Sequence, residues 1–244
     1  MGSVELNGYN LHDNRVSTVQ GFLAHTYVDN VVRPIGPVED RLENYDWRDG
    51  AILLGSFFRC PEITLGVWFV GNDSEKRHKA IRQVFFERSG VPTGPVTLKF
   101  SDDLGRYYKV IRTGAIETVD YIDSTYVTVT FKSIYPWLLG ETKTVQNDAT
   151  FEYRGVPTPI SGIGTITPSS ATVYLSVNGS YTLHLVGMTT GSAVPLRFDA
   201  EATTCNQAVS ASTKWPYLTY SSNARMGFNG ATGSVTFTYT ERWL

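Results

Sequence analysis

Residues 234–240 read Ser-Val-Thr-Phe-Thr-Tyr-Thr, with an apolar side chain at every second position. Successive side chains of an extended strand point to opposite faces, so this spacing predicts a strand with one face in a core and the other in water. The same alternation recurs in residues 63–69, 96–100 and 127–131. These segments predict half-buried antiparallel strands, and the chain is therefore expected to be mainly β.

A single helix is predicted over residues 72–90. Asn72-Asp73-Ser74 offers side chains that can cap a helix N-terminus, and Gly90 is a natural C-terminal stop. The apolar residues that recur at helical spacing are Ile81, Val84 and Phe85. Because the net charge is not basic, the cationic residues of this helix are interpreted as a solvated face rather than a binding patch. They are Lys76, Arg77, Lys79 and Arg82.

Turn residues predict two hairpins. Residues 101–106 contain Asp side chains that can cap a turn and a Gly that can take positive φ, so Phe100 and Tyr107 should flank a hairpin. Asn178-Gly179 predicts a second one. Apolar residues of the two strands face each other only if one residue is added to the turn. This predicts a bulge or a three-residue loop, with Val177 opposite Tyr181 and Val173 opposite Leu185.

Composition predicts two domains, residues 1–140 and residues 141–244. The first segment holds 15 of the 21 basic and 17 of the 23 acidic residues, whereas the second is rich in Ser, Thr and Gly. Pro136 cannot donate to a sheet, so a strand should stop before it. No helical period follows residue 140, and the second domain is expected to be a β-sandwich of jelly-roll or lectin-like type.

Charge and length exclude several classes of protein. The formal net charge is -2, which argues against a basic nucleic-acid binder, and no run approaches the roughly 20 apolar residues of a membrane span. Two cysteines make no disulfide framework, and four scattered histidines offer no spacing for a metal site. The N-terminus lacks the pattern of a signal peptide, so a soluble protein made in a reducing cytoplasm is expected, without cofactor or metal.

Local signatures of catalysis are missing. No nucleophile elbow is present, and Glu117, Asp120 and Asp123 are interpreted as solvated charges rather than a glycosidase pair. Gly162 and Gly164 are not followed by the Lys-Ser/Thr of a phosphate loop, and a sheet corner is the preferred interpretation.

Aromatic residues near the C-terminus could form a platform for sugars or a partner. The candidates are Trp215, Tyr217 and Tyr220, with Trp243 further along the chain. Large aromatic side chains are more often core or interface anchors, and that alternative is favoured here.

Several runs along the chain resemble siphophage distal tail proteins. In the N-terminal half they are residues 47–55 (WRDGAILLG), the strand at 63–70, the helix, the 98–108 hairpin and residues 128–137 (TVTFKSIYPW). In the C-terminal half they are residues 195–199 (PLRFD), 215–218 (WPYL) and 241–244 (ERWL). The resemblance spans nearly the whole chain in the same order. It departs from the family where residues 221–223 (SSN) replace a Pro-Gly turn before the asparagine.

The resemblance implies a structural protein rather than an enzyme. Residues 1–140 would be a tail-tube-like β-sandwich with one helix and a long β-hairpin that builds a homo-hexameric ring, and residues 141–244 a galectin-like domain. The ring would join the tail tube protein to a tail-associated lysin or tail-fibre hub protein and to receptor-binding or baseplate proteins. DNA would pass through its lumen, and the protein would be part of the virion, assembled in the host cytoplasm without membrane insertion.

Two sets of residues are candidates for contacts within that assembly. Trp47, Arg48, Asp49 and Gly50 combine an aromatic and an arginine beside a flexible glycine, which predicts a subunit-contact loop, although an ordinary tight turn fits equally well. Asp102 and Asp103, at the predicted hairpin tip, are expected to face the lumen or a neighbouring ring. The alternative function is a carbohydrate-binding β-sandwich that contacts host cell-wall sugars through Trp215, Tyr217 and Tyr220.

Overall fold

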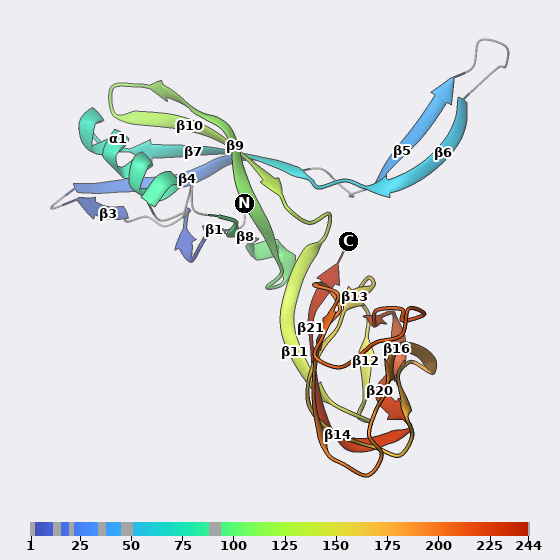
Figure 1. Ribbon diagram of the computed structural model, residues 1–244. Coiled ribbons are helices and arrows are strands. Elements are labelled where there is room, and N and C mark those ends of the chain that lie inside the picture. Colours follow the sequence, from blue (N-terminus) through green and yellow to red (C-terminus); the bar gives the residue numbers. More distant parts are fainter. Residues whose placement is uncertain are drawn as a thin grey trace. The chain divides into compact units, whose positions relative to one another are not determined.

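The protein, seen here as a computed structural model, consists of two compact units (Figure 1). One unit lies within Met1–Leu139 and the other is Gly140–Trp243. The structure describes residues 3–11, 16–19, 22–33, 38–44, 51–87 and 94–243. Each unit has its own apolar core, and each is described separately.

The first unit is built on one antiparallel sheet. Its strand order is β3-β4-β7-β10-β9-β8-β1-β2. The bounds are β1 (Val4–Leu6), β2 (Tyr9–Asn10), β3 (Val16–Val19), β4 (Phe22–Val32), β7 (Glu62–Val70), β8 (Val96–Phe100), β9 (Tyr107–Asp120) and β10 (Ser124–Ser133). A separate two-stranded sheet pairs β5 (Val38–Asn44) with β6 (Ala51–Phe58).

The inward faces of these strands form the core that the alternation predicts. Val67 and Phe69 of β7 are fully buried, as are Val127 and Phe131 of β10. Val96, Leu98 and Phe100 of β8 are also buried. The strand assignments for residues 63–69, 96–100 and 127–131 are therefore confirmed.

Helix α1 (Ser74–Arg82) packs on β3, β4, β7 and β10 and continues as a π-helical turn over Gln83–Glu87 (Figure 1). Asp73 is its N-cap, with a carboxylate oxygen that accepts from the Lys76 amide at 3.1 Å. The predicted stop at Gly90 lies outside the described residues. The interpretation of the basic residues as a solvated face is wrong for Arg77, which is 1% exposed, because this side chain finds hydrogen-bond acceptors under the helix.

The hairpin predicted between Phe100 and Tyr107 is present. β8 and β9 pair, and a 3₁₀ turn at Ser101–Asp103 connects them. Leu104 and Gly105 both adopt positive φ, at 51° and 83°. β10 ends at Ser133, before Pro136 as expected, and β11 (Leu138–Gln146) begins the connection to the second unit.

The second unit is a two-sheet β-sandwich, and residues 140–243 contain no helix. One sheet has the order β18-β17-β14-β21-β11 and the other β12-β20-β15-β16, with β13 and β19 forming a short pair. The bounds are β12 (Thr150–Tyr153), β13 (Thr158–Pro159), β14 (Ser161–Pro168), β15 (Thr172–Val177), β16 (Ser180–Val186), β17 (Val194–Asp199), β18 (Thr204–Cys205), β19 (Tyr217–Leu218), β20 (Ser221–Asn229) and β21 (Ala231–Trp243).

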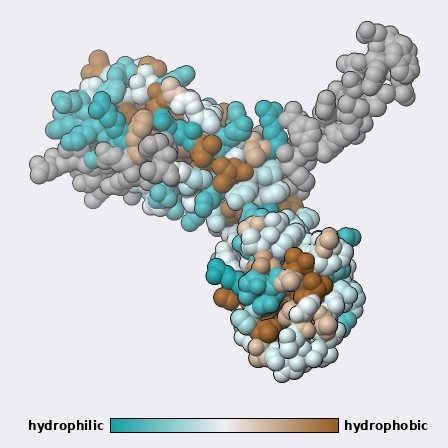
Figure 2. Space-filling model, viewed as in Figure 1, coloured by the Kyte–Doolittle hydropathy of each residue, from teal (hydrophilic) through white to brown (hydrophobic). Residues whose placement is uncertain are grey.

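Aromatic contacts join the two sheets of this sandwich. The rings of Phe228 and Phe237 lie 6.0 Å apart between centroids, and those of Phe151 and Tyr239 lie 5.8 Å apart. Val235, Phe237 and Tyr239 are all buried, so the alternating stretch of residues 234–240 is an inward-facing strand as predicted. Figure 2 shows the visible face of this unit dominated by weakly hydrophilic residues, which agrees with its Ser and Thr content.

Two local expectations in this unit need correction. Gly162 and Gly164 lie within β14, a strand paired on both sides, and not at a sheet corner. A Cβ at Gly162 would collide with the Phe198 ring, and one at Gly164 with the backbone of Ser234, so these glycines permit close packing. Asn178-Gly179 is a two-residue turn in which Val177 pairs with Ser180 and not with Tyr181. The expected extra residue is nevertheless present, as a register shift between Tyr174 and Ser176.

Candidate functional site

The predicted subunit-contact loop, Trp47, Arg48, Asp49 and Gly50, lies outside the described residues. The strands that flank it are β5 and β6, whose ends Asn44 and Ala51 are paired. Its role in subunit contact stays a prediction.

Asp102 and Asp103 bind an arginine of another strand end. Arg33 Nη1 donates to the two carboxylate oxygens of Asp103 at 2.8 and 3.0 Å, and Nη2 donates to Asp102 at 2.5 Å. The guanidinium carbon also lies 4.7 Å from the centroid of the Phe100 ring. The two carboxylates therefore fix the end of the β8–β9 hairpin to the segment that follows β4.

Burial distinguishes the two acidic residues. The Asp103 side chain is 12% exposed, and burial raises the pKa of this carboxyl while the Arg33 guanidinium opposes the rise. Desolvation thus offsets part of the attraction in this ion pair. The Asp102 side chain is 63% exposed and remains accessible to solvent beside the arginine. Of the two, Asp102 is the one that could meet a molecule outside the subunit.

The three aromatic residues proposed as a platform differ in their surroundings. Trp215 is half-buried and packs on the core of the second unit, which fits the alternative of a core anchor. Tyr217 lies on β19 and is 44% exposed, and Tyr220 is 71% exposed. No ring contact joins any two of these three described residues. They do not form one stacked set.

An outward-facing row of apolar residues crosses four strands of the first unit. Cross-strand pairing sets Tyr27 of β4 opposite Trp68 of β7, Trp68 opposite Tyr126 of β10, and Tyr126 opposite Val119 of β9. Residues that pair directly share a face of a sheet. We call Tyr27, Trp68, Tyr126 and Val119 the outer row. Tyr27 is 40% and Val119 is 52% exposed.

Ring contacts consolidate this row. The Trp68 ring lies 4.8 Å from that of Tyr126 and 6.2 Å from that of Tyr27, between centroids. Tyr121, from the turn between β9 and β10, adds a third contact to Trp68 at 5.4 Å. A Cβ at Gly66 would collide with the Tyr126 hydroxyl, so glycine lets this ring lie close over the sheet.

A buried arginine holds the turn at the end of the row. Arg77 Nε donates to Thr125 Oγ1 at 2.8 Å, and Nη2 donates to the Tyr121 carbonyl at 3.0 Å. Nη1 donates to the carbonyls of Gly71 and Ile122. Ile122 itself is 97% exposed, so the helix side of this turn is fixed while its apolar tip faces solvent.

A carboxylate extends the same cluster. Thr125 donates its hydroxyl to Asp120 at 2.6 Å, and a second oxygen of Asp120 lies 2.8 Å from His78 Nε2. The hydrogen bonds from Thr125 and then from His78 hold the pKa of Asp120 below its ordinary value. Asp120 therefore anchors helix α1 to the β9–β10 turn.

Sequence reasoning missed the outer row, although a signal for it exists. Residues 67–70 read Val-Trp-Phe-Val, so the alternation of β7 stops and both faces become apolar. A strand with two apolar faces needs a second partner or leaves one face to bind something. Which other residues join Trp68 depends on cross-strand register, and a single strand does not reveal it.

Metal-binding and membrane-spanning features are not found in the described part of the chain. No group of three or more His, Cys, Asp or Glu residues there is arranged to hold a metal ion. No helix in the same residues is long and apolar enough to cross a bilayer. Cys60 and Cys205 are both free.

The protein is similar over its whole length to a solved structure of a phage protein. The crystal structure of the SPP1 Dit protein, described as a paradigm of the hub adsorption apparatus in phages that infect Gram-positive bacteria, has a TM-score of 0.70. The identity is 15%, and the match covers 100% of both chains.

Two structures of the phage P2 baseplate in its activated conformation, with Ca and with Sr, have TM-scores of 0.47. Their identities are 9% and 8%, with 88% and 99% of this chain covered and 90% and 98% of theirs. No protein-family model and no curated protein matches the sequence. The predicted resemblance to phage distal tail proteins is confirmed at the level of fold, and this chain has the fold of the SPP1 Dit protein.

Proposed function

We propose that this chain is a non-enzymatic subunit of a bacteriophage tail tip, a distal tail protein that connects the tail tube to baseplate or tail-fibre proteins. The observation that carries the proposal is the Dit-like fold over both units at a TM-score of 0.70. The protein would then be part of the virion and would be assembled in the host cytoplasm.

The subunits would form a ring of six through head-to-tail contacts. Such contacts close into a ring when one surface patch repeatedly meets a different patch on the next copy. The outer row and Ile122 support a contact of this kind, because exposed aromatic side chains on a rigid support are typical of interface hot spots. We therefore propose them as subunit-contact residues, alongside the loop that contains Trp47.

The lumen of the ring would let DNA pass without binding it. Phosphate binding requires a surplus of Lys and Arg, whereas the net charge here is -2. Asp102 supports a lumenal or ring-stacking position for the β8–β9 hairpin tip, because its side chain keeps 63% of its surface exposed while it pairs with Arg33. Asp103 would hold this tip in place through its two hydrogen bonds from Arg33.

Light scattering behind a sizing column tests the ring. At increasing concentration we expect a species near six times 27.1 kDa. Ile122→Asp should shift the protein to monomer, because a charge would be buried at the contact. Val209→Asp is the control, since Val209 is also an exposed apolar residue, at 36%, and belongs to the second unit and to neither proposed set of contact residues. A monomer at every concentration, or equal effects of the two variants, would contradict the proposed contact.

A further inference from the structure

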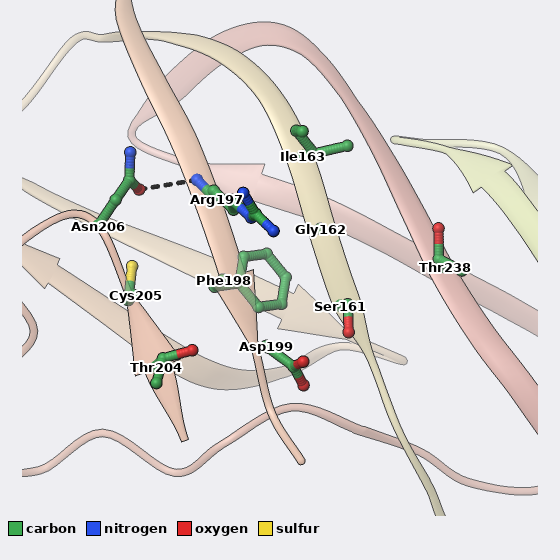
Figure 3. Close-up of a pocket in the computed structure, with 10 residues that line it drawn as sticks. All are labelled: Ser161, Gly162, Ile163, Arg197, Phe198, Asp199, Thr204, Cys205, Asn206 and Thr238. Carbon is green, nitrogen blue, oxygen red and sulfur yellow. Dashed lines mark hydrogen bonds between the residues drawn. The ribbon is translucent and has the colours of Figure 1, made fainter. Parts of the chain in front are cut away.

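A hollow of about 630 Å³ lies on the outer face of the sheet that contains β14, β17 and β21 (Figure 3). It forms where the outward side chains are short. Ser161 of β14 pairs with Thr238 of β21 on one side and with Asp199 of β17 on the other. Longer side chains border the hollow. Among them are Ile163 and Arg197, which pair with each other two residues along the strands from Ser161 and Asp199.

A second hollow, of about 100 Å³, adjoins the first and shares Ser161 and Thr238 with it. Thr240 and Arg242 of β21 line this second part. The two hollows together make a groove across four strands, β18, β17, β14 and β21, which we call the hydroxyl groove. Pro159 also lines the second hollow, and it pairs in the sheet with Tyr217, which is 44% exposed.

The groove offers hydrogen-bonding groups of every kind. The hydroxyls of Ser161, Thr204, Thr238 and Thr240 line it, and each hydroxyl can both donate and accept. The Arg197 guanidinium, on the exposed side of β17, has no hydrogen-bond or ion-pair partner among the described residues.

Acidic groups balance the basic ones. Asp199 accepts two backbone amides through Oδ1, at 2.9 and 3.3 Å, and Oδ2 has no hydrogen-bond partner among the described residues. Arg242 pairs with Glu201 at 3.0 Å. Two arginines and two carboxylates thus line the groove, and their formal charges cancel. A polyanion or a polycation gains no net attraction from such a lining.

We infer that the hydroxyl groove binds a neutral oligosaccharide. Such a ligand has many hydroxyls that donate and accept, carries no net charge, and presents C–H faces that can pack on Ile163, which is 59% exposed. A peptide fits less well, because the groove crosses the face of a sheet, and the edge strand that borders it, β18, is only two residues long and offers little room for main-chain bonds. The inference does not depend on the proposed tail-tip role.

Isothermal titration calorimetry of the whole protein tests this inference. The probes are maltohexaose, cellohexaose and chitohexaose, with oligogalacturonate and polyglutamate as anionic comparisons. An open groove of this kind predicts a dissociation constant on the order of 1 mM for at least one neutral hexasaccharide. Arg197→Ala should weaken that binding about tenfold, because bonds to a charged donor are lost.

A pair of variants on one strand separates the groove from the rest of the sheet. Ser161→Tyr should abolish binding by filling the groove. Thr165→Tyr is the matched control, because Thr165 is exposed two positions beyond Ile163 on the same strand and does not line either hollow. Equal melting temperatures of the two variants would show that both are folded.

Three results would overturn the inference. The first is that no neutral hexasaccharide binds at a concentration of about ten times the expected dissociation constant. The second is that Ser161→Tyr binds as well as the unchanged protein. The third is that an anionic probe binds more tightly than every neutral one. Loss of binding in Ser161→Tyr but not in Thr165→Tyr would support it. Light scattering measures the mass of the assembly, whereas calorimetry measures saccharide binding to the groove. Either proposal can therefore fail without the other.

Discussion

Replacing Arg77 by Ala should destabilise the first unit by about 3 kcal/mol. Three of its hydrogen bonds go to Thr125 and to the carbonyls of Tyr121 and Gly71, and each bond from a charged donor contributes roughly 1.5–3 kcal/mol. The desolvation of the buried guanidinium, which is 1% exposed, costs part of that sum. The net loss should therefore correspond to one or two such bonds.

Urea unfolding followed by tryptophan fluorescence measures this loss. With a slope of about 1–3 kcal/mol/M, the midpoint of the first unit should fall by roughly 1–3 M. The transition of the second unit should stay in place, because Arg77 contacts only residues of its own unit. Hydrogen exchange at residues 121–124 should accelerate in the same variant, since the turn loses its anchor.

Arg82→Ala is the matched control on the same helix. Arg82 is exposed, and an exposed substitution changes stability by less than about 0.5 kcal/mol. If Arg77→Ala and Arg82→Ala unfold at the same urea concentration, the proposed anchoring of the β9–β10 turn is wrong.

Three further predictions concern stability. In urea unfolding, Asp103→Ala should lower the free energy of unfolding by about 1–2 kcal/mol, because it leaves the half-buried Arg33 with fewer partners. Asp102→Ala should lower it by less than about 1 kcal/mol, because it removes an exposed ion pair. Equal losses in the two variants would contradict this order. Gly162→Ala should cost about 1–3 kcal/mol by calorimetry, because its Cβ meets the Phe198 ring; an unchanged melting temperature would refute the close packing. Burial raises the pKa of Tyr239 to about 12, so stability should be complete below about pH 10 and fall as the pH rises toward 12. Tyr239→Phe should flatten that fall in melting curves across this range, and a parallel decline of both proteins would disprove the assignment.

The inward faces of the strands could be predicted because alternation identifies them one strand at a time. Val67 and Phe237 are buried for the reason that their spacing indicates. Arg77 shows the limit of reading residue types alone. It stands four positions before Ile81 and so lies on the apolar stripe of the helix, yet its charge led to the interpretation of a solvated position.

The hairpin around Asn178-Gly179 shows how a correct constraint can be met in an unexpected place. Apolar matching required one extra residue, and the structure has a register shift between Tyr174 and Ser176 that restores the predicted pairing of Val173 with Leu185. Val177 nevertheless pairs with Ser180, because both turn residues accept positive φ and a two-residue turn can form. The need to pair apolar residues across the two strands determines that one extra residue is present. The residues of the turn determine where along the hairpin that extra residue lies.

Outward faces are the part that a single strand cannot predict, because their chemistry depends on which strands become neighbours. Trp68 gains its place in the outer row only when β4 and β10 set Tyr27 and Tyr126 opposite it. Ser161 likewise becomes the centre of the hydroxyl groove only when register sets Thr238 and Asp199 on either side. A one-residue slip of β10 or β14 would keep the composition of each strand but move these side chains to the opposite face of the sheet. The outer row and the hydroxyl groove are therefore encoded by register, and substitutions that shift register should abolish binding at either surface even where every outward residue is retained.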